Sequence, residues 1–357
     1  MKIVLVISSL TSGGAERVLT TLANYWSEKG WDVTILAILS HDQGFYKLHK
    51  NIEVQSLDIR YKNPILNTFW YLYGIRKIVK TINPNYIVSF ISAVNIYTLL
   101  SLIGLKKTVV ISERNYYNVL KSKPWRLLRR ITYPLTKGLV VLSKEDDEYY
   151  TYVQNKKMIF NPLLVENLPK CHLEEKEKLI IAVGTLTEQK GFDRLIKSIV
   201  GIEMSDWHVE IIGEGPKREE LMTLIHSLEL GDKVSLVGRK SNIYEYYKKA
   251  SIFVLSSRWE GFPNVLAEAM AHGCACIAYD CKTGPSSIID HGDSGYLVEE
   301  GNILALNERI SEVIFDEKIR EKFFFNALKI REVLNVENIA REWESYLISL
   351  SQEKGKL

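Results

Sequence analysis

The sequence predicts an α/β fold with two doubly wound, Rossmann-like parallel-sheet domains. Short apolar, β-branched runs alternate with stretches of helical periodicity along the chain. The alternation is interrupted by a polar stretch near residues 162–177 and then resumes. The chain has 357 residues, which is enough for two hydrophobic cores at about 150 residues per domain.

The first domain is predicted to span residues 1–165. Each expected strand is a short apolar run that ends in a polar or glycine-containing turn. The expected strands are residues 3–8, 32–38, 86–91, 108–113 and 139–143, and helices are expected over 15–29 and near 65–80.

The second domain is predicted to span residues 166–335, and a final helix over 336–357 is expected to pack back on the first domain. The expected strands of the second domain are residues 179–184, 208–213, 234–238, 252–257 and 274–279, and the chain is helical in pattern from 302 to 350. Ligands of such sheets bind beyond the carboxyl ends of the strands, so a cleft between the two domains is the expected site.

The composition is that of an ordinary globular protein, with 46% apolar and 25% charged residues. This excludes a disordered chain and a disulfide scaffold. The charge is divided unevenly: residues 1–165 hold 22 Lys and Arg against 11 Asp and Glu, whereas residues 166–357 hold 24 against 32. The basic first domain is therefore expected to meet an anionic partner, such as phosphate, a membrane surface or nucleic acid.

The N-terminal apolar run and the cysteines both favour a cytoplasmic protein. The run before Ser8 is seven residues long, too short for a signal peptide or a membrane span. The four cysteines are Cys171, Cys274, Cys276 and Cys281. We interpret them as reduced thiols, because a metal site needs more ligands than Cys274, Cys276 and the nearby His272.

Two glycine-containing turns are candidate anion sites. Ser12-Gly13-Gly14 follows the first strand and opens the first helix, where backbone amides lack helical partners. Gly213-Glu214-Gly215 is a similar turn in the second domain. A tight strand-to-helix turn with no ligand explains either turn equally well, and the missing third glycine argues against a dinucleotide dehydrogenase.

Lys190 lies in the stretch "VGTLTEQKGFDRLI", between a strand that ends at Gly184 and an amphipathic helix. A lysine beside helix amides suits a diphosphate, each contribution being about 0.3–1 kcal/mol at an exposed terminus. The alternative is a solvated lysine with no ligand.

Two carboxylates in "EGFPNVLAEAM" have the spacing of a binding site. Glu260 follows a predicted strand, Pro263 fits the start of a helix and Gly273 fits its end, so Glu268 lies more than one turn inside. The amides of Phe262, Asn264 and Val265 would lie at the positive end of this helix. Two hydroxyl-accepting carboxylates around an anion site match a nucleotide sugar, although Glu268 on a solvated helix face is the alternative.

These motifs together resemble the retaining glycosyltransferases of family 4, which have the two-domain GT-B fold. The resemblance is carried nearly end to end by "GGAERV", "VGTLTEQKG", "EGFPNVLAEAM" and "GPSSIIDHGDSGYLV". More narrowly, "SGGAER" and "ISERNYYNVLKSKPWRLLRRITYPL" resemble bacterial enzymes that extend undecaprenyl-diphosphate-linked oligosaccharides, notably the N-acetylgalactosaminyltransferases of protein N-glycan assembly.

The resemblance implies a UDP-sugar donor and assigns roles to matching residues. Glu268 would hold the ribose, Glu260 would face the transferred sugar, Lys190 would pair with the diphosphate and Arg239 would lie beside the uracil. The implied donor-binding residues are Gly14, Gly184, Thr185, Lys190, Gly213, Arg239, Arg258, Glu260, Gly261, Phe262, Asn264, Val265 and Glu268, and the implied catalytic residues are Glu260, Lys190 and Arg114.

This chain departs from the family pattern at two positions. Thr185 stands where relatives often have arginine, so a phosphate partner is missing and Arg258 is a candidate replacement. Arg114 stands where many relatives have histidine, which leaves its catalytic role open. The sequence has no Asp-x-Asp, so we expect activity with no cofactor and no divalent metal, the leaving-group charge being stabilised by Lys190, Arg258 and helix amides.

Residues 123–135 form a predicted amphipathic, basic helix. On a 100° wheel the cations gather on one arc and Leu127, Leu128, Ile131 and Leu135 on the opposite one. The cations are Lys123, Arg126, Arg129 and Arg130. We expect this helix to border the membrane and to bind the acceptor diphosphate, the alternative being a helix packed on its own sheet with a solvated cationic face.

The sequence therefore predicts a retaining hexosyltransferase on the inner face of the cell membrane. Its donor would be a UDP-sugar, with GalNAc favoured, and its acceptor a lipid-diphosphate-linked glycan of surface polysaccharide or glycoprotein assembly. A sugar-nucleotide epimerase or hydrolase, or transfer to a soluble acceptor, is the alternative. Nucleic acid is not an expected partner, because the basic residues lack interleaved aromatic stacking motifs.

Overall fold

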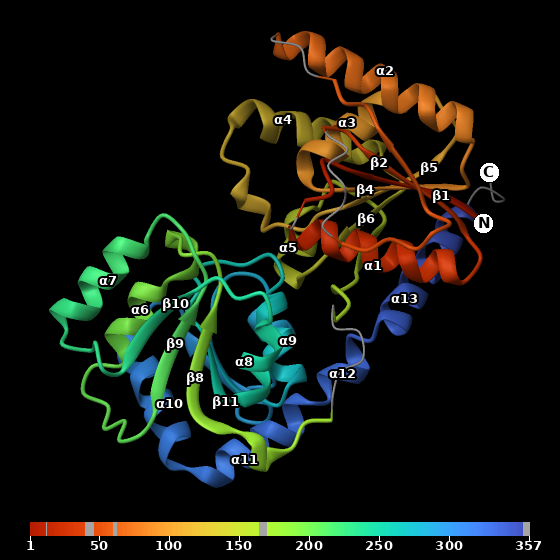
Figure 1. The fold of residues 1–357 in the computed structure, drawn as a ribbon. Helices are drawn as coiled ribbons and strands as arrows, with labels where there is room; N and C mark the ends of the chain where they lie inside the picture. The colour runs from red at the N-terminus through yellow and green to blue at the C-terminus, as the bar shows by residue number, and fades with distance from the viewer. Residues whose placement is uncertain (12, 40–45, 60–62, 164–169, 353–357) are drawn as a thin grey trace. The chain divides into compact units, whose positions relative to one another are not determined.

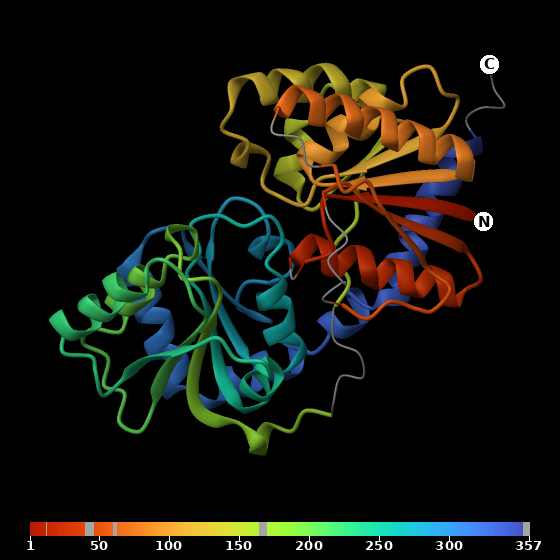
Figure 2. The ribbon, with the colours of Figure 1, turned by 45° about the horizontal axis from the view of Figure 1, so that its top comes forward.

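The computed structural model describes residues 1–11, 13–39, 46–59, 63–163 and 170–352 and divides the chain into two compact units (Figure 1). Unit 1 is Met1–Leu164 with Leu334–Leu357, and unit 2 is Val165–Val333. The sequence places these divisions at 165 and 335. Each unit is a parallel sheet with helices on both faces (Figures 1 and 2).

The sheet of unit 1 has the strand order β3-β2-β1-β4-β5-β6-β7. Its strands are β1 (Lys2–Ile7), β2 (Asp32–Ala37), β3 (Glu53–Ser56), β4 (Tyr86–Phe90), β5 (Thr108–Ser112), β6 (Gly138–Val141) and β7 (Lys156–Met158). The central strands are buried on both faces, as expected for continuous apolar runs in a parallel sheet. The sequence analysis missed the edge strands β3 and β7, which are polar.

Helices of unit 1 cover both faces of this sheet. They are α1 (Gly14–Glu28), α2 (Pro64–Ile82), α3 (Ser92–Ser101), α4 (Lys123–Thr132), α5 (Lys144–Tyr149) and α13 (Val336–Gln352), with short 3-10 turns η1 (Tyr117–Val119) and η2 (Tyr133–Leu135). Helices α2, α3 and α4 form one layer, and α1 packs with α13 on the other side (Figure 1).

The last helix, α13, completes the core of unit 1 although it follows unit 2 in the chain. Its Trp343 is fully buried and meets Trp26 of α1 edge to face, with ring centroids 6.5 Å apart. This is the helix that the sequence predicts to return to the first domain.

Unit 2 has a six-stranded sheet of order β10-β9-β8-β11-β12-β13. Its strands are β8 (Glu177–Val183), β9 (His208–Ile212), β10 (Val234–Gly238), β11 (Ala250–Leu255), β12 (Ala275–Asp280) and β13 (Gly295–Glu299). Its helices are α6 (Phe192–Ser198), α7 (Arg218–Ser227), α8 (Ile243–Lys249), α9 (Asn264–Ala271), α10 (Ile303–Phe315), α11 (Glu317–Ala327) and α12 (Ile330–Val333), with 3-10 turns η3 (Leu173–Glu175), η4 (Glu188–Lys190) and η5 (Pro285–Ser287).

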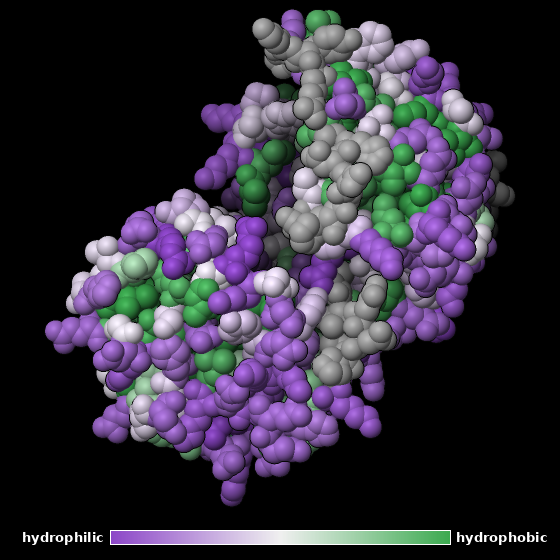
Figure 3. Space-filling view, in the orientation of Figure 1, coloured by the Kyte–Doolittle hydropathy of each residue, from purple (hydrophilic) through white to green (hydrophobic). Residues whose placement is uncertain are grey.

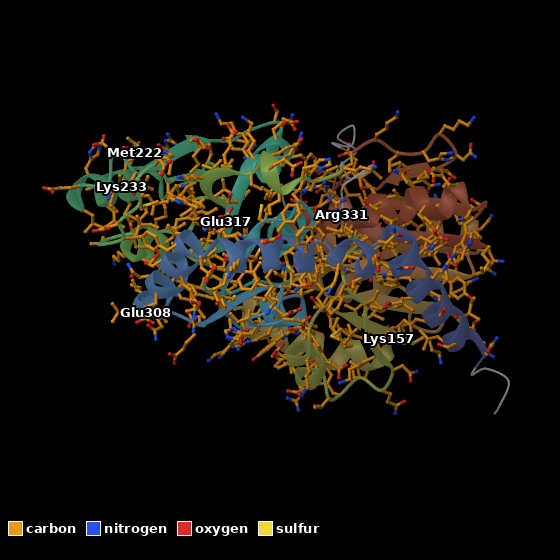
Figure 4. The ribbon with its side chains drawn as sticks, turned by 90° about the horizontal axis from the view of Figure 1, so that it is seen from below. Lys157, Met222, Lys233, Glu308, Glu317 and Arg331 are labelled. Carbon is orange, nitrogen blue, oxygen red and sulfur yellow. The ribbon has the colours of Figure 1, made fainter. Side chains whose placement is uncertain are left out.

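Helices α10 and α11 lie on the outside of unit 2, where Glu308 and Glu317 project into solvent (Figure 4). Arg331 of α12 points inward instead, and its Nε donates to the Ala271 carbonyl at 2.7 Å, which holds the end of α9. Within the described ranges, no helix combines the length and the hydropathy of a membrane span.

Candidate active site

Two loops at the carboxyl edge of the unit 2 sheet are joined into one structure. The turn η4, after β8, and the loop after β11 are joined by several hydrogen bonds between residues about 70 positions apart in sequence. The Arg258 amide donates to the Gln189 carbonyl at 2.8 Å, the Ser256 hydroxyl to the Lys190 carbonyl at 2.9 Å, and the Gln189 side-chain amide to the Trp259 carbonyl at 3.0 Å. The positions of Lys190 and Glu260 are therefore fixed together.

Lys190 and Glu260 form an ion pair on these two loops. The Lys190 Nζ lies 2.7 Å from Glu260 Oε1, and the side chains are 18% and 6% exposed. The same carboxylate oxygen accepts from the Ser257 hydroxyl at 2.6 Å, and the Thr283 hydroxyl donates to the Glu260 carbonyl. Because both charges are largely shielded from water, the pair is a preformed polar centre.

Glycines make this close approach possible. A Cβ on Gly184 would lie 3.1 Å from the Lys190 side chain, which passes directly over it. Gly191 has φ +62°, and a Cβ there would lie 2.2 Å from the Ser256 carbonyl oxygen. Gly191 therefore excludes a larger residue for steric reasons, whereas a Cβ at Gly184 would require the Lys190 side chain to shift by a few tenths of an ångström.

Arg258 is already paired with carboxylates in the structure. Its guanidinium binds Asp193 through two hydrogen bonds of 2.9 and 2.8 Å, and its Nε lies 3.2 Å from Glu188. The Asp193 pKa is lowered, burial being outweighed by the Arg258 hydrogen bond and charge. The structure thus assigns Arg258 to holding η4, and its phosphate-binding role stays a prediction.

Glu268 lies on α9 and is held by a tyrosine that the motif does not contain. The Tyr247 hydroxyl on α8 donates to Glu268 Oε2 at 3.2 Å, and burial followed by the Glu268 charge raises the Tyr247 pKa well above its ordinary value. His272 stacks on Tyr247 and donates from Nδ1 to the Glu268 carbonyl at 2.7 Å. Burial lowers the His272 pKa to about 4, so this histidine is neutral at pH 7.

A pocket of about 260 Å³ lies beside these groups at the carboxyl edge. It is lined by Val183, Gly184, Thr185, Ile212, Gly213, Glu214, Arg239, Lys240, Ile243, Tyr247, Val265 and Glu268. Six of these are predicted donor-binding residues: Gly184, Thr185, Gly213, Arg239, Val265 and Glu268. Gly184 also contacts the Lys190 side chain, so the wall of the pocket leads to the ion pair.

Other predicted residues of unit 2 lie outside the lining of this pocket. Phe262 is buried, Gly261 is half-buried, and the Asn264 amide donates to the Phe262 carbonyl at 2.9 Å. Pro263 caps α9 one residue before its first turn. The sequence analysis missed Tyr247, Lys240 and Ile243, which come from α8 and the loop before it and belong to no quoted motif.

Comparison with known proteins decides the family. The model described as "Glycosyl transferases group 1" matches residues 165–329, and "Glycosyltransferase Family 4" matches residues 12–155. A Campylobacter jejuni protein described as "GalNAc-alpha-(1->4)-GalNAc-alpha-(1->3)-diNAcBac-PP-undecaprenol alpha-1,4-N-acetyl-D-galactosaminyltransferase" is 32% identical over 96% of this chain and 97% of its own length. The chain is a family 4 glycosyltransferase.

A further relative is also a glycosyltransferase, and solved structures show the fold. The "Amylovoran biosynthesis glycosyltransferase AmsD" of Erwinia amylovora is 27% identical over 97% of this chain and 99% of its own. Anabaena Alr3699/HepE in complex with UDP superposes with a TM-score of 0.81 at 17% identity, covering 98% of this chain and 100% of that one. A sucrose-phosphate synthase from Thermosynechococcus elongatus gives 0.82 at 16% identity, with 99% of both chains covered. The glycosyltransferase therefore has the GT-B fold.

Gly14 is the first residue of α1 in unit 1 of this glycosyltransferase. The helix is preceded by Gly13, where a Cβ would collide with the Glu16 carboxylate. Glu16 is buried, and burial raises its pKa. The sequence analysis overlooked this acid at the start of α1. Ser12 lies outside the described residues, and the donor-binding role of Gly14 stays a prediction.

Arg114 of the glycosyltransferase is buried in unit 1. Its guanidinium lies 5.2 Å from the Phe90 ring and 5.6 Å from the Trp343 ring, and Nη1 donates to Asn161 at 2.6 Å. Burial lowers its pKa to about 9, and within the described residues Nε and Nη2 have no hydrogen-bond partner. Its predicted catalytic role remains untested.

Glu113, next to Arg114, belongs to a buried polar network that the sequence analysis did not identify. The Ser92 hydroxyl donates to Glu113 at 2.9 Å, and the Tyr133 hydroxyl donates to its other oxygen. Burial raises the Glu113 pKa to about 7. Asp146, at the start of α5, has a pKa raised to about 6, also by burial.

The structure corrects the predicted orientation of α4 at Arg129. This residue is 1% exposed, donates to the Tyr117 carbonyl at 2.9 Å and to the Tyr149 hydroxyl at 3.0 Å, and so cannot face a membrane or a diphosphate. Lys123, Arg126 and Arg130 are exposed. The alternative is a helix packed on its own sheet with a solvated cationic face. Three of its cations are solvated, but the apolar residues Leu127, Leu128, Ile131 and Leu135 are exposed as well.

Proposed function

We propose that this glycosyltransferase moves a hexose or N-acetylhexosamine from a UDP-sugar to an undecaprenyl-diphosphate-linked glycan, with retention of configuration. The observation that carries the proposal is the pocket with Glu268 on its wall, continuous through Gly184 with the Lys190–Glu260 pair. The pocket with Glu268 would hold the nucleoside, Lys190 the diphosphate and Glu260 the transferred sugar. This is the order in which a nucleotide sugar presents these three parts.

The donor half of the proposal assigns each group a task. Glu268, oriented by Tyr247, would accept hydrogen bonds from the ribose hydroxyls. Lys190 would neutralise charge on the leaving diphosphate, and a preorganised cation in a shielded site is worth about 3–4 kcal/mol of transition-state stabilisation. Because Lys190 would then be shared between the diphosphate and Glu260, the Glu260 carboxylate would also accept a hydrogen bond from a hydroxyl of the transferred sugar.

The acceptor half is supported by the relatives. The Campylobacter jejuni relative named above acts, by its description, on a diNAcBac-PP-undecaprenol glycan. A second protein of that organism, 29% identical over 97% of this chain and 99% of its own, is described as acting on N-acetylgalactosamine-N,N'-diacetylbacillosaminyl-diphospho-undecaprenol. Both are N-acetylgalactosaminyltransferases, so we propose GalNAc as the first sugar to test.

We also propose that catalysis needs no divalent metal. The sequence lacks Asp-x-Asp, and Lys190 supplies a positive charge where the diphosphate would lie. Turnover in excess EDTA should equal turnover in Mg²⁺. Activity that is lost on chelation and restored by one metal ion would contradict this.

We propose that the protein associates peripherally with the cytoplasmic face of the membrane. The exposed cations Lys123, Arg126 and Arg130 of α4 would bind anionic headgroups or the acceptor diphosphate, each cation contributing about 1 kcal/mol near such a surface. Charge reversal at Arg126 and Arg130 should weaken vesicle binding and raise the acceptor KM.

The decisive test is a panel of UDP- and GDP-sugars with defined lipid-diphosphate acceptors, with products read by mass spectrometry. The variants Glu268→Ala and Lys190→Ala should lose donor affinity, whereas the matched controls Glu308→Ala and Lys233→Ala, on the outside of unit 2, should not (Figure 4). Release of UDP without a glycosylated product would instead favour a hydrolase or epimerase.

A further inference from the structure

The outer face of α2 carries apolar side chains where a surface helix normally carries polar ones. In its first half, the exposed positions are Ile65 (76%), Leu66 (45%), Phe69 (61%), Trp70 (37%) and Tyr73 (51%). They follow the i, i+4, i+8 spacing of one helix face, and Lys77 continues the same line. Figure 3 shows hydrophobic surface over this part of unit 1.

The exposed aromatic rings on α2 form an ordered group. Phe69 and Trp70 meet edge to face with centroids 5.8 Å apart, and Trp70 and Tyr73 do the same at 5.7 Å. These contacts are made at the surface, among side chains that remain accessible to solvent. An exposed apolar group of this kind marks an interaction site.

Helix α4 extends this face across the layer of α2, α3 and α4. Tyr97 of α3 joins the helices, because it contacts Tyr71 of α2 at 5.8 Å and Trp125 of α4 at 5.6 Å between ring centroids. On α4, Leu127 and Ile131 are exposed. Two neighbouring helices therefore both leave apolar residues uncovered.

A groove of about 520 Å³ continues the apolar surface beyond the end of α4. Its lining includes the apolar residues Leu99, Leu102 and Leu135 and the lysines Lys106, Lys107 and Lys137. Its walls are apolar and its rim is cationic. This pairing of properties suits a hydrocarbon chain that ends in an anionic headgroup.

The segment that builds these helices is almost free of acids. Residues 59–144 contain fifteen Lys and Arg residues and one acid, Glu113, which is buried. The rest of the chain holds more acids than bases. Nothing acidic in the described part of this segment is therefore at the surface to repel an anionic partner, whereas a protein-docking surface normally mixes both signs.

We infer that the outer face of α2, α3 and α4 docks on an anionic lipid bilayer, with Phe69, Trp70 and Tyr73 in the interfacial layer. Aromatic side chains favour that layer, and lysine and arginine around them bind the headgroups. Helices α2 and α4 both begin at the carboxyl edge of the sheet, where Gly14 opens α1. The bilayer would therefore lie beside the edge at which the proposed function requires a lipid-linked acceptor.

Vesicle co-sedimentation of the full chain tests this inference. Wild type should bind vesicles of phosphatidylglycerol and phosphatidylcholine, and Phe69→Ser/Trp70→Ser should lower the partition coefficient at least about tenfold. The matched control is Leu304→Ser/Phe315→Ser, which removes two exposed apolar side chains of unit 2 and should change nothing. Equal binding by wild type and the α2 double variant would overturn the inference.

Two further measurements separate the possible failures. Light scattering tests the alternative that a second copy of the chain covers this face. In that case wild type would be a dimer, Phe69→Ser/Trp70→Ser would be a monomer, and neither would bind vesicles. The inference rests on the proposed function in one respect: a lipid-linked acceptor is the reason for docking on a membrane. Transfer is therefore assayed separately, with a short-chain, water-soluble acceptor. The variant Phe69→Ser/Trp70→Ser should keep its transfer rate with the soluble acceptor, and its rate with the long-chain acceptor in vesicles should fall at least about tenfold. If wild type transferred sugar to neither acceptor, the proposed function alone would be contradicted.

Discussion

The two units share one architecture but direct their charges in opposite ways. Unit 2 turns charged side chains toward each other at its carboxyl edge, as in Lys190–Glu260 and Arg258–Asp193, next to a small pocket. Unit 1 buries its one acid between residues 59 and 144 and shows cations and apolar groups to solvent. Paired charges around a pocket suit a small polyanion, whereas cations spread over a broad face suit an extended anionic surface.

The largest effect is expected from a substitution that removes one charge of the Lys190–Glu260 pair in unit 2. Lys190→Ala should lower kcat/KM by about 100- to 1000-fold, because it removes the cation that we propose to neutralise the leaving diphosphate. Steady-state kinetics with saturating acceptor and calorimetric titration of UDP would measure it. Lys190→Arg should recover part of the loss, since a cation is restored; equal losses in both variants would point to a purely structural role.

Two arginines of α4, one buried and one exposed, should differ in their contribution to the free energy of unfolding. Arg129→Ala should destabilise the protein by about 2–4 kcal/mol, because it removes a buried guanidinium from its carbonyl, hydroxyl and aromatic partners. Arg126→Ala, on the exposed side of the same helix, should stay within about 0.5 kcal/mol of wild type. Thermal and urea unfolding would measure both, and similar losses for the two would contradict the burial of Arg129.

The pH dependence of unfolding tests the buried acid of unit 1. The Glu113 pKa is raised from 4.5 to about 7, so the folded state binds the proton more tightly than the unfolded state and loses stability as pH rises from about 4.5 to 7. Glu113→Gln should remove this loss, and its stability relative to wild type should be higher at pH 8 than at pH 5. A constant difference across that range would argue against the shifted carboxyl.

The smallest expected effect concerns the tyrosine behind Glu268. Tyr247→Phe removes one hydroxyl donor and should raise the donor KM about three- to tenfold with little change in kcat, because a typical intramolecular hydrogen bond contributes about 0.5–1.5 kcal/mol. Initial rates over a UDP-sugar series would show the split. A fall in kcat at constant KM would place Tyr247 in the chemical step instead.

The central strands could be predicted from the sequence, as could the edge strand β10, whereas the edge strands β3, β7 and β13 could not. Strands such as β1, β4 and β11 are continuous apolar runs because both of their faces are buried. At the edges, β3 and β7 have one neighbour each and keep polar residues, so their pattern resembles a loop. Hydrogen bonding to an adjacent strand, which the sequence does not show, makes them strands.

Site residues were predictable where one stretch of chain carries them. Glu260 and Glu268 could be placed on a loop and a helix by their spacing alone, and Lys190 by the turn before α6. Tyr247 could not be found this way, because it reaches Glu268 from a separate helix 21 positions earlier. The helical wheel assigned Arg129 to the cationic face, since it cannot show that Tyr117, Tyr149 and Tyr150 enclose that side chain.

The return of α13 to unit 1 has a consequence for the order of synthesis. Unit 2 is one uninterrupted segment, Val165–Val333, so the ribosome delivers all of it before the helix that bears Trp343. Until that helix is made, unit 1 cannot cover the partners of Trp343 in its core. Met1–Leu164 thus precedes unit 2 in the chain but completes its core after it, and in that interval Trp26 and Phe90 lack their contacts with Trp343.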